Sequence, residues 1–577
     1  MLALLLVCAL ALTVRLLDVQ VRQHATLAAD AAAQQQSVVT IPATRGRILD
    51  RTGRVLASDV RVWEVFADPG LIPADRRADV AGSLAPILNM GPGHIRDLIN
   101  VQSQFVVLAH GVSDAIKAKV TGLGYSGLGT TEENKRVYNE SPVPGTSFAS
   151  NLLGFVDASG NGQYGVEGYY NSTLGGRDGQ SATIQDSAGN TIALSHEKTV
   201  PPQNGSDLQL GLDPQVQYWA EQALAQGVTS SKAQSGTAMV MDVKTGAIRA
   251  WADYPSYDAN NYATASYADL KDATVSDLYE PGSVMKTVTF AGGLDQHVIT
   301  PNYAFDEGPV NIDGFTIKDW DFQAHGRITM QYVLEQSLND GAIKVMQLMG
   351  MDSFYRNLLA FGIGAPTGID LAGEVNQPIP PEPQMTPVDA AVASFGQGVE
   401  TTPVEMLAAT NAVANGGVWV QPHAVEDTIN PATGVRTPFV PVTRRIMDPT
   451  DAATLAHMLT GVVDVLSPHP VGSGFEVSLA KPYPPHEDLT PLPQWLNRIA
   501  GKTGTASEVD AATGQYGSLV DVSFIGFLPV PNPQFTLMVL LQKPTVCTIS
   551  CEGAYVAAPI WKQIAVQTID AWRIEPN

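Results

Sequence analysis

The chain opens with an apolar stretch that carries no charge over its first fourteen residues. Residues 1–14 are apolar except Thr13, and as a helix they span about 21 Å, or about 26 Å when counted through Leu17. The hydrocarbon core of a bilayer is roughly 30 Å thick, so the segment spans it only if Arg15 reaches toward the headgroups. We expect an uncleaved membrane anchor over residues 1–20, with a cleaved signal peptide as the alternative.

The pattern changes after a polar neck at residues 22–37, which reads as helical or extended. Short apolar runs of strand length follow, and the turn signal 51–54 separates two of them. Helix-like and loop-like segments then mix, and glycine, asparagine, serine and tyrosine dominate residues 122–179. This composition predicts a loop-rich, elongated β module, with strands at 38–41, 47–49 and 55–57.

A second pattern begins near residue 205. Asp213 is a good N-cap and Pro214 suits the first helical position, so residues 214–227 are predicted to be a helix. Two apolar strands around a turn at 243–246 predict a hairpin. The pattern therefore divides the chain into three parts, which are residues 1–20, 21–205 and 206–577.

The composition of the chain excludes some classes of binding partner. The 577 residues are 44% apolar and 16% charged, with a net charge of −23, which is a globular profile with an acidic surface. Such a surface cannot neutralise a row of phosphates or adhere to anionic lipid, so we expect no nucleic-acid partner. The ten histidines stand singly, none at metal-ligand spacing, and the sequence predicts no metal site.

Three cysteines leave one question open. Cys8 lies in the apolar opening, whereas Cys547 and Cys551 are four residues apart near the C-terminus. A small disulfide loop is expected if this region lies outside the cytoplasm. Two free thiols are the alternative, because the sequence shows no geometry.

Candidate chemistry begins at Ser283, which lies three residues before Lys286 at the start of a predicted helix over 284–294. At this spacing the two side chains share one helix face, so the amine can take the proton of the serine hydroxyl. Its pKa must then fall through burial or a nearby positive charge, which Lys502 could supply. Taken alone, a solvated helix pair explains such a motif better.

Ser337 and Asn339 form a second motif, after a helical stretch at 330–334. The hydroxyl of Ser337 can relay a proton between Lys286 and a leaving amine, and the amide of Asn339 can hold a substrate amide. Glu335 also begins a Glu-x-x-Leu-Asn string, which in class A β-lactamases supplies the deacylating glutamate. No separate Ser-x-Asn lies between Lys286 and Glu335, so the stretch is assigned to the Ser-x-Asn role.

The third motif is Lys502-Thr503-Gly504-Thr505, within a predicted strand whose neighbours are expected at 522–530 and 535–542. Lys502 and Thr503 suit recognition of a carboxylate, and Gly504 lets substrate approach the strand. The backbone N–H groups of Ser283 and Thr505 would form an oxyanion hole. A second Lys-Thr-Gly at 244–246 lies in a turn signal and is expected to reverse the chain only.

The three motifs occur in one order, 54 and then 165 residues apart, and together they resemble those of a class B penicillin-binding protein. Further segments carry the resemblance over nearly the whole chain, at 45–53, 165–176, 236–260 and 394–403. The chain departs from the family in a Pro-rich stretch at 460–499 and in lacking basic residues before the anchor. Either the true start lies upstream or the anchor is unusually bare.

The resemblance implies an α/β (α+β) fold: an N-terminal anchor, an elongated β-rich pedestal, and a transpeptidase domain with a central antiparallel sheet, flanking helices and a helical subdomain. It implies a single-pass cell-membrane protein whose catalytic domain is extracytoplasmic. It also implies a serine D,D-transpeptidase that cross-links peptidoglycan stem peptides, needs no cofactor and is acylated by β-lactams. A polytopic membrane glycosyltransferase is the implied partner. Septal and elongation roles stay open, with the opening 42–46 slightly favouring division.

Two other functions are kept as alternatives. A D,D-carboxypeptidase or β-lactamase needs fast water attack on the acyl-enzyme, and neither a separate deacylating glutamate nor a use for a long pedestal is apparent. A non-catalytic β-lactam sensor should have cytoplasmic signalling sequence or several membrane spans, and neither is apparent. A pure envelope scaffold need not keep every catalytic group, yet all of them are present. We therefore expect Ser283, Lys286 and Ser337 to be catalytic, and the remaining motif residues to bind substrate: Asn339, Lys502, Thr503, Gly504 and Thr505.

Overall fold

The computed structural model describes residues 1–27, 36–184, 198–381, 384–463, 472–480, 492–510 and 515–576. Half of the predicted neck and much of the Pro-rich stretch lie outside these ranges. The described chain divides into two compact units, one formed by residues 1–46 with 172–206 and the other by residues 47–171 with 207–577. The boundaries at residues 20 and 205 stay predictions.

The first unit contains the apolar helix and a small sheet. Helix α1 (Leu2–Leu17) continues as a π-helical turn, η1 (Asp18–Arg22). Residues 3–22 make it the single described helix that is long and apolar enough to cross a membrane. The sheet is antiparallel, in the order β1 (Gln36–Ile41), β8 (Gly179–Ile184), β9 (Lys198–Val200). The predicted first strand is confirmed.

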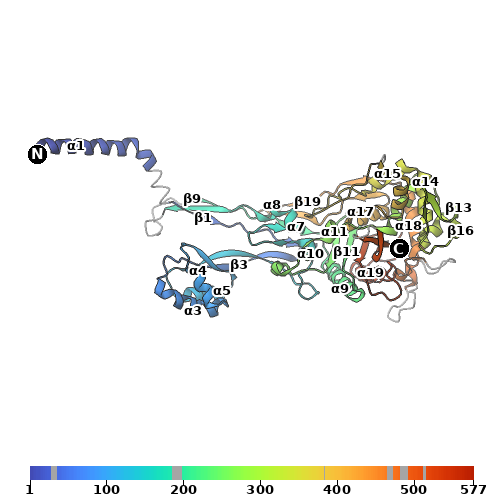
Figure 1. The fold of residues 1–577 in the computed structure, drawn as a ribbon, viewed down its shortest axis with the longest axis horizontal. Helices are drawn as coiled ribbons and strands as arrows, with labels where there is room; N and C mark the ends of the chain where they lie inside the picture. Colours follow the sequence, from blue (N-terminus) through green and yellow to red (C-terminus); the bar gives the residue numbers. More distant parts are fainter. Residues whose placement is uncertain are drawn as a thin grey trace. The chain divides into compact units, whose positions relative to one another are not determined.

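The second unit begins with a β-rich portion. The short strand β2 (Ile48–Leu49) turns into the long strand β3 (Val55–Ala67), which pairs antiparallel with β4 (Val106–Val112) and with β5 (Leu128–Tyr138). Three helices pack together beside these strands (Figure 1) and share with them one apolar cluster: α3 (Arg77–Leu88), α4 (Pro92–Ile99) and α5 (Asp114–Gly122).

The sheet that carries the third motif has five antiparallel strands. Their order is β12 (Ile248–Tyr254), β11 (Ser235–Asp242), β23 (Phe535–Gln542), β22 (Gln515–Leu528) and β21 (Ala500–Asp510). Helices α9 (Pro214–Ser231) and α19 (Ala557–Trp572) cover one face, where Trp561 packs against Phe524 at 5.2 Å between ring centroids. The predicted hairpin and both strands predicted after the third motif are confirmed, with β22 directly beside β21 and β23 one strand further into the sheet.

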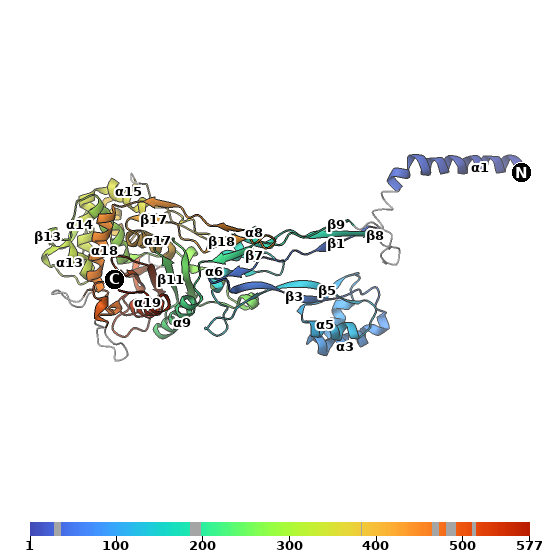
Figure 2. The same cartoon turned by 180° about the vertical axis from the view of Figure 1, so that it is seen from behind.

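A further set of helices of the unit gathers in one region, which Figure 2 shows from behind. Their contacts link α12 to α14, α15, α17 and α18, and α13 to α14 and α18, while α18 also reaches β21. The helices are α12 (Lys286–Asp295), α13 (Met330–Gln336), α14 (Asn339–Met349), α15 (Met351–Phe361), α16 (Pro387–Ala393), α17 (Pro403–Ala414) and α18 (Pro449–Val463).

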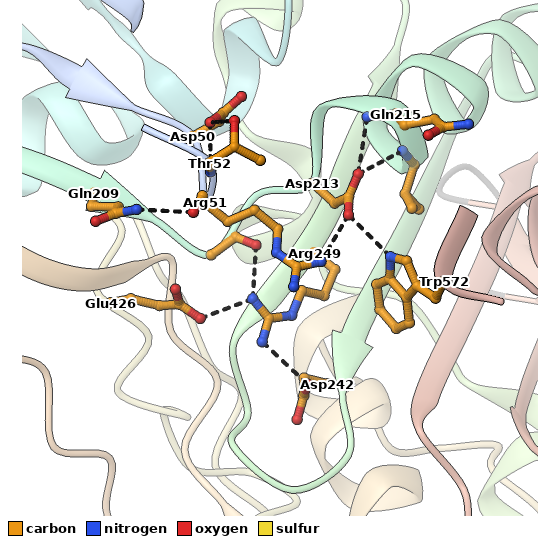
Figure 3. A network of polar contacts seen from close by, with 12 residues as sticks. Asp50, Arg51, Thr52, Gln209, Asp213, Gln215, Asp242, Arg249, Glu426 and Trp572 are labelled. Atoms are coloured by element: carbon orange, nitrogen blue, oxygen red, sulfur yellow. Dashed lines mark hydrogen bonds and ion pairs between the residues drawn. The ribbon is translucent and has the colours of Figure 1, made fainter. Parts of the chain in front are cut away.

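A polar network joins the β2–β3 turn to the sheet (Figure 3). Asp213 caps α9 as predicted, accepting hydrogen bonds from the backbone N–H groups of Gln215 and Val216. Its other carboxylate oxygen accepts from Arg51 at 2.8 Å and from the Trp572 indole at 3.0 Å. One carboxylate therefore ties the turn, the start of α9 and the end of α19 together.

Candidate active site

Ser283 lies on a short 3-10 turn (Gly282–Met285) that leads directly into α12. Gly282 has a φ of +57°, and a Cβ at this position would lie 2.8 Å from the carbonyl oxygen of Thr505 on β21. Its N–H donates to the carbonyl of Gly396 at 3.0 Å. The turn therefore packs closely against two neighbouring segments, which the glycine at position 282 permits. Ser283 consequently lies beside the strand that carries the third motif.

Lys286 reaches back to Ser283 from the first turn of α12. Its Nζ lies 3.0 Å from the Ser283 Oγ, 2.5 Å from the carbonyl oxygen of Ser337 and 2.9 Å from Oδ1 of Asn339. The side chain is fully buried. Burial lowers the pKa of the amine to about 7, although the carboxylates of Asp319 and Asp340 act to raise it. A substantial neutral fraction therefore exists near neutral pH.

Ser337 ends α13 in the left-handed conformation, with a φ of +59°. Its Oγ accepts a hydrogen bond from Nζ of Lys502 at 2.9 Å and lies 3.4 Å from Nζ of Lys286. The hydroxyl is therefore within reach of both amines, which is the location that a proton relay requires.

Lys502 projects from β21, where it pairs in register with Ile525 of β22. Its Nζ also donates to the carbonyl and the hydroxyl of Thr503, both at 3.2 Å. Burial and the nearby charge of Lys286 hold the pKa of Lys502 well below its usual value. Gly504 has a packing reason to be glycine, because a Cβ there would collide with the Ser523 hydroxyl.

A cleft of about 590 Å³ opens over these groups. Among the predicted residues it is lined by Ser283, Ser337, Asn339, Thr503 and Thr505, whereas Lys286 and Lys502 lie behind its wall. The three motifs therefore converge on one cleft, with Ser283 in its lining and both amines buried beneath.

The sequence did not identify the aromatic rim of this cleft. Phe475 and Tyr555 pack edge to face at 5.9 Å between ring centroids, and both line the cleft. Short-range patterns carry no signal for them, because they come from segments far from the motifs. The other aromatic residues of the lining are Trp320, Phe322 and Phe395.

A disulfide precedes part of that rim. Cys547 and Cys551 are bonded, which resolves the alternative between a bridge and two thiols. Two residues later the N–H of Gly553 donates to the Thr505 hydroxyl at 3.2 Å. The small loop thus leads into a segment that rests on the strand of the third motif.

The two misleading strings lie elsewhere in the fold. Glu335 is buried, accepts a hydrogen bond from Gln331 of the same helix at 2.9 Å, and is absent from the described lining of the cleft. Lys244 lies on the β11–β12 hairpin, where its amine donates to Asn415 at 3.1 Å at the surface. Neither arrangement favours a part in the chemistry of Ser283.

One group of described residues could hold a metal ion. Ligand atoms of Glu307, Asp319 and His325 lie within 4.8 Å of one another, and Glu307 and Asp319 are buried. The sequence had suggested no such group, since the three residues follow no ligand spacing. Asp319 already accepts hydrogen bonds from the backbone, so the group has a structural use without an ion.

Comparison with known families gives two adjoining matches. Residues 40–210 match the penicillin-binding protein dimerisation domain, and residues 236–565 match the penicillin-binding protein transpeptidase domain. Together they cover most of the chain.

Individual proteins resemble it over almost their whole length. A probable peptidoglycan D,D-transpeptidase PbpC of Pseudomonas aeruginosa is 30% identical, over 98% of this chain and 94% of its own. Penicillin-binding protein PbpB of Mycolicibacterium smegmatis is 29% identical, over 96% and 86%. The crystal structure of penicillin-binding protein 3 of Mycobacterium tuberculosis, complexed with aztreonam, is 25% identical, covers 93% of this chain and 98% of its own, and has a TM-score of 0.70.

Proposed function

This chain belongs to the class B penicillin-binding proteins, and on that premise we propose that it is a serine-type peptidoglycan D,D-transpeptidase. It cross-links stem peptides and is acylated by β-lactams. The observation that carries the serine mechanism is the buried amine of Lys286, 3.0 Å from the Oγ of Ser283. A buried neutral amine at this distance can accept the proton that makes the hydroxyl a nucleophile.

In the acylation step, the Oγ of Ser283 attacks the carbonyl of the penultimate D-alanine as its proton moves to Nζ of Lys286. The oxyanion accepts hydrogen bonds from the N–H groups of Ser283 and Thr505, and one such donor typically contributes about 3–4 kcal/mol to the transition state. Collapse breaks the peptide bond, and the departing D-alanine amine receives a proton through the Ser337 hydroxyl. An ester on Ser283 remains.

In the second step, an amine of a neighbouring stem peptide attacks that ester. Its proton leaves through the same Lys286 and Ser337 groups, Ser283 regains its hydroxyl, and the new peptide bond is the cross-link. Asn339 holds the backbone amide of the donor, and Lys502 with Thr503 and Thr505 binds its carboxylate. Gly504 lets the substrate approach the strand closely.

The parts outside the cleft suit a protein of the cell envelope. We assign residues 1–20 to a membrane anchor, 21–205 to a pedestal and 206–577 to the transpeptidase domain, with the catalytic domain outside the cytoplasm. The apolar helix over residues 3–22 and the dimerisation-domain match over 40–210 support this division. A polytopic membrane glycosyltransferase would supply the glycan strands.

The lifetime of the acyl-enzyme separates this function from the hydrolase alternative. A fluorescent penicillin should label the purified protein and stay attached over many minutes, because neither carboxylate of the described cleft lining, Asp319 or Glu552, is hydrogen-bonded to Ser283, whose side chain contacts Lys286 instead. Release of the label within seconds would favour a β-lactamase or carboxypeptidase. Growth with Ser283→Ala as the sole copy tests the scaffold alternative, and normal wall cross-linking in that strain would favour it.

A further inference from the structure

Asp319 lies in the loop between β15 (Phe315–Ile317) and β16 (Gly326–Thr329), yet its carboxylate reaches the start of α14. Its Oδ1 accepts hydrogen bonds from the backbone N–H of Asn339 and, at 3.0 Å, from that of Asp340. Leu338, the N-cap residue of α14, supplies no side-chain acceptor. The first N–H groups of this helix are thus satisfied by a residue about twenty positions earlier in the chain.

The same loop holds the other side of the junction between α13 and α14. The indole N–H of Trp320 donates to the carbonyl of Gln336 at 3.0 Å. Ser337, Leu338 and Asn339 therefore lie between two contacts made by adjacent residues of one loop. This three-residue junction presents the carbonyl of Ser337 and Oδ1 of Asn339 to Nζ of Lys286.

We infer that Asp319 is a positioning residue of the acylation reaction, whose carboxylate fixes the α13–α14 junction so that Ser337 and Asn339 stay in contact with Lys286. The inference rests on the proposed function. Asp319 itself makes no contact with Ser283. Its side chain is 1% exposed, and its Oδ2 has no hydrogen-bond partner among the described residues. Burying a carboxylate with one oxygen unpaired costs folding free energy. Fixing the α13–α14 junction is the role that explains why a carboxylate is kept at this position.

The surrounding charges give the carboxylate a second, measurable effect. Glu307 of β13 (Ala304–Glu307), Asp340 of α14 and Lys286 of α12 share its environment, with His325 beside β16. The negative charge of Asp319 raises the pKa of Lys286 against the lowering by burial. Removing that charge should lower this pKa, so that the neutral amine persists to a lower pH.

Three substitutions separate the two effects of Asp319, which are its hydrogen bonds to the α13–α14 junction and its negative charge. Asp319→Asn keeps an oxygen acceptor for the two N–H groups and removes the charge, whereas Asp319→Ala removes both. Asp321→Asn is the matched control, because Asp321 lies in the same loop but bonds to Gln323 and His325 instead of the junction. The readouts are the second-order rate constant for acylation by a fluorescent penicillin between pH 5.5 and 8.5 and the thermal midpoint of each variant.

Asp319→Ala should acylate on the order of 100-fold more slowly, because a displacement of about 1 Å at a catalytic group has this effect. Asp319→Asn should acylate within about fivefold of the wild-type rate, because a neutral hydrogen bond replaces a charged one. The fall of its acylation rate at acid pH, which is the acid limb of the pH profile, should move to lower pH. The control should match the wild type. A purely structural role would not move the acid limb.

The inference is overturned if Asp319→Ala acylates at the wild-type rate, if Asp319→Asn is as slow as Asp319→Ala, or if its acid limb stays in place. Where Asp319→Ala does not fold, the comparison of Asp319→Asn with Asp321→Asn decides alone. The Ser283→Ala variant distinguishes a failure of the proposed function from a failure of this inference. Labelling that persists in Ser283→Ala defeats the proposed function, whereas labelling confined to Ser283 with indifferent Asp319 variants defeats this inference only.

Discussion

The hydroxyl of Ser337 accepts a hydrogen bond from Nζ of Lys502 at 2.9 Å, although 165 residues separate them in the chain. The same hydroxyl lies 3.4 Å from Nζ of Lys286, which in turn contacts Ser283. Two buried amines thus meet at one serine oxygen, behind the cleft that Ser283 lines. Burial lowers the pKa of both amines, and the charge of Lys286 lowers that of Lys502 further; a lowered pKa is what a lysine general base requires.

Acylation should depend on pH through Lys286. Its pKa is about 7, lowered chiefly by burial, and only the neutral amine can accept the proton of Ser283. Below pH 7 the neutral fraction falls tenfold per pH unit, so the rate constant for acylation by penicillin should fall about tenfold per unit as well. A rate that stays constant from pH 8 to pH 5.5 would contradict the role of this amine.

Lys286→Ala should reduce acylation by about 10²- to 10⁴-fold, the range typical of a lost general base. Circular dichroism should show an unchanged fold, because alanine is a good helix former at the start of α12. Lys244→Ala is the matched control, since it removes a surface lysine from the other Lys-Thr-Gly triplet. If the control variant loses activity, the wrong triplet has been assigned to the site.

Glu221 should make stability depend on pH. Its carboxylate on α9 is buried, accepts from Ser141, Ala149 and Gln217, and has a pKa raised by burial to about 7 from a usual 4.5. Between these values the folded protein keeps a proton that the unfolded chain releases, so stability falls as pH rises from about 4.5 to 7, by on the order of 3 kcal/mol.

Glu221→Gln should flatten that dependence, because the neutral amide does not titrate. The thermal midpoint measured from pH 5 to 8 checks this, with the exposed Glu132→Gln as a control that leaves the profile of the wild type unchanged. A wild-type midpoint that rises steadily from pH 5 to 7 would show that the carboxylate is charged in the folded protein, contrary to the account.

Removal of the disulfide should destabilise the aromatic rim of the cleft without abolishing acylation. Cys547→Ser with Cys551→Ser opens a small loop, which typically costs about 2 kcal/mol of stability. Loosening of the Gly553 contact with Thr505 should slow acylation by about fivefold, the value of one neutral hydrogen bond. Cys8→Ser, which alters the remaining cysteine, is the control and should behave as wild type. Complete loss of labelling would give the loop a larger role than the structure supports.

Local signals predicted the parts of the fold that local forces determine. Asp213 and Pro214 marked the start of α9, and the apolar runs around 243–246 marked the β11–β12 hairpin. Strand order was not predicted from pattern, because β11 pairs with β23 across almost 300 residues and no short-range signal encodes such a pairing. The long partner of β3 was likewise missed inside the glycine-rich stretch at 122–179.

The site could be predicted where the spacing of two residues along a helix is enough to bring their side chains together. Lys286 lies one helical turn from Ser283, so a side-chain contact was expected and is observed. Asp319 was missed because its contact with α14 depends on how a loop folds back, and its surroundings in sequence look like an ordinary turn. The aromatic rim was missed for the same reason, since its members converge only through the tertiary fold.

Mass spectrometry of the protein after reaction with a penicillin tests the central claim most directly. The account predicts one added penicilloyl group per chain, carried by the peptide that contains Ser283, and no adduct in Ser283→Ala. An adduct on any other residue, or an equal adduct in the alanine variant, would contradict the assignment of Ser283 as the nucleophile.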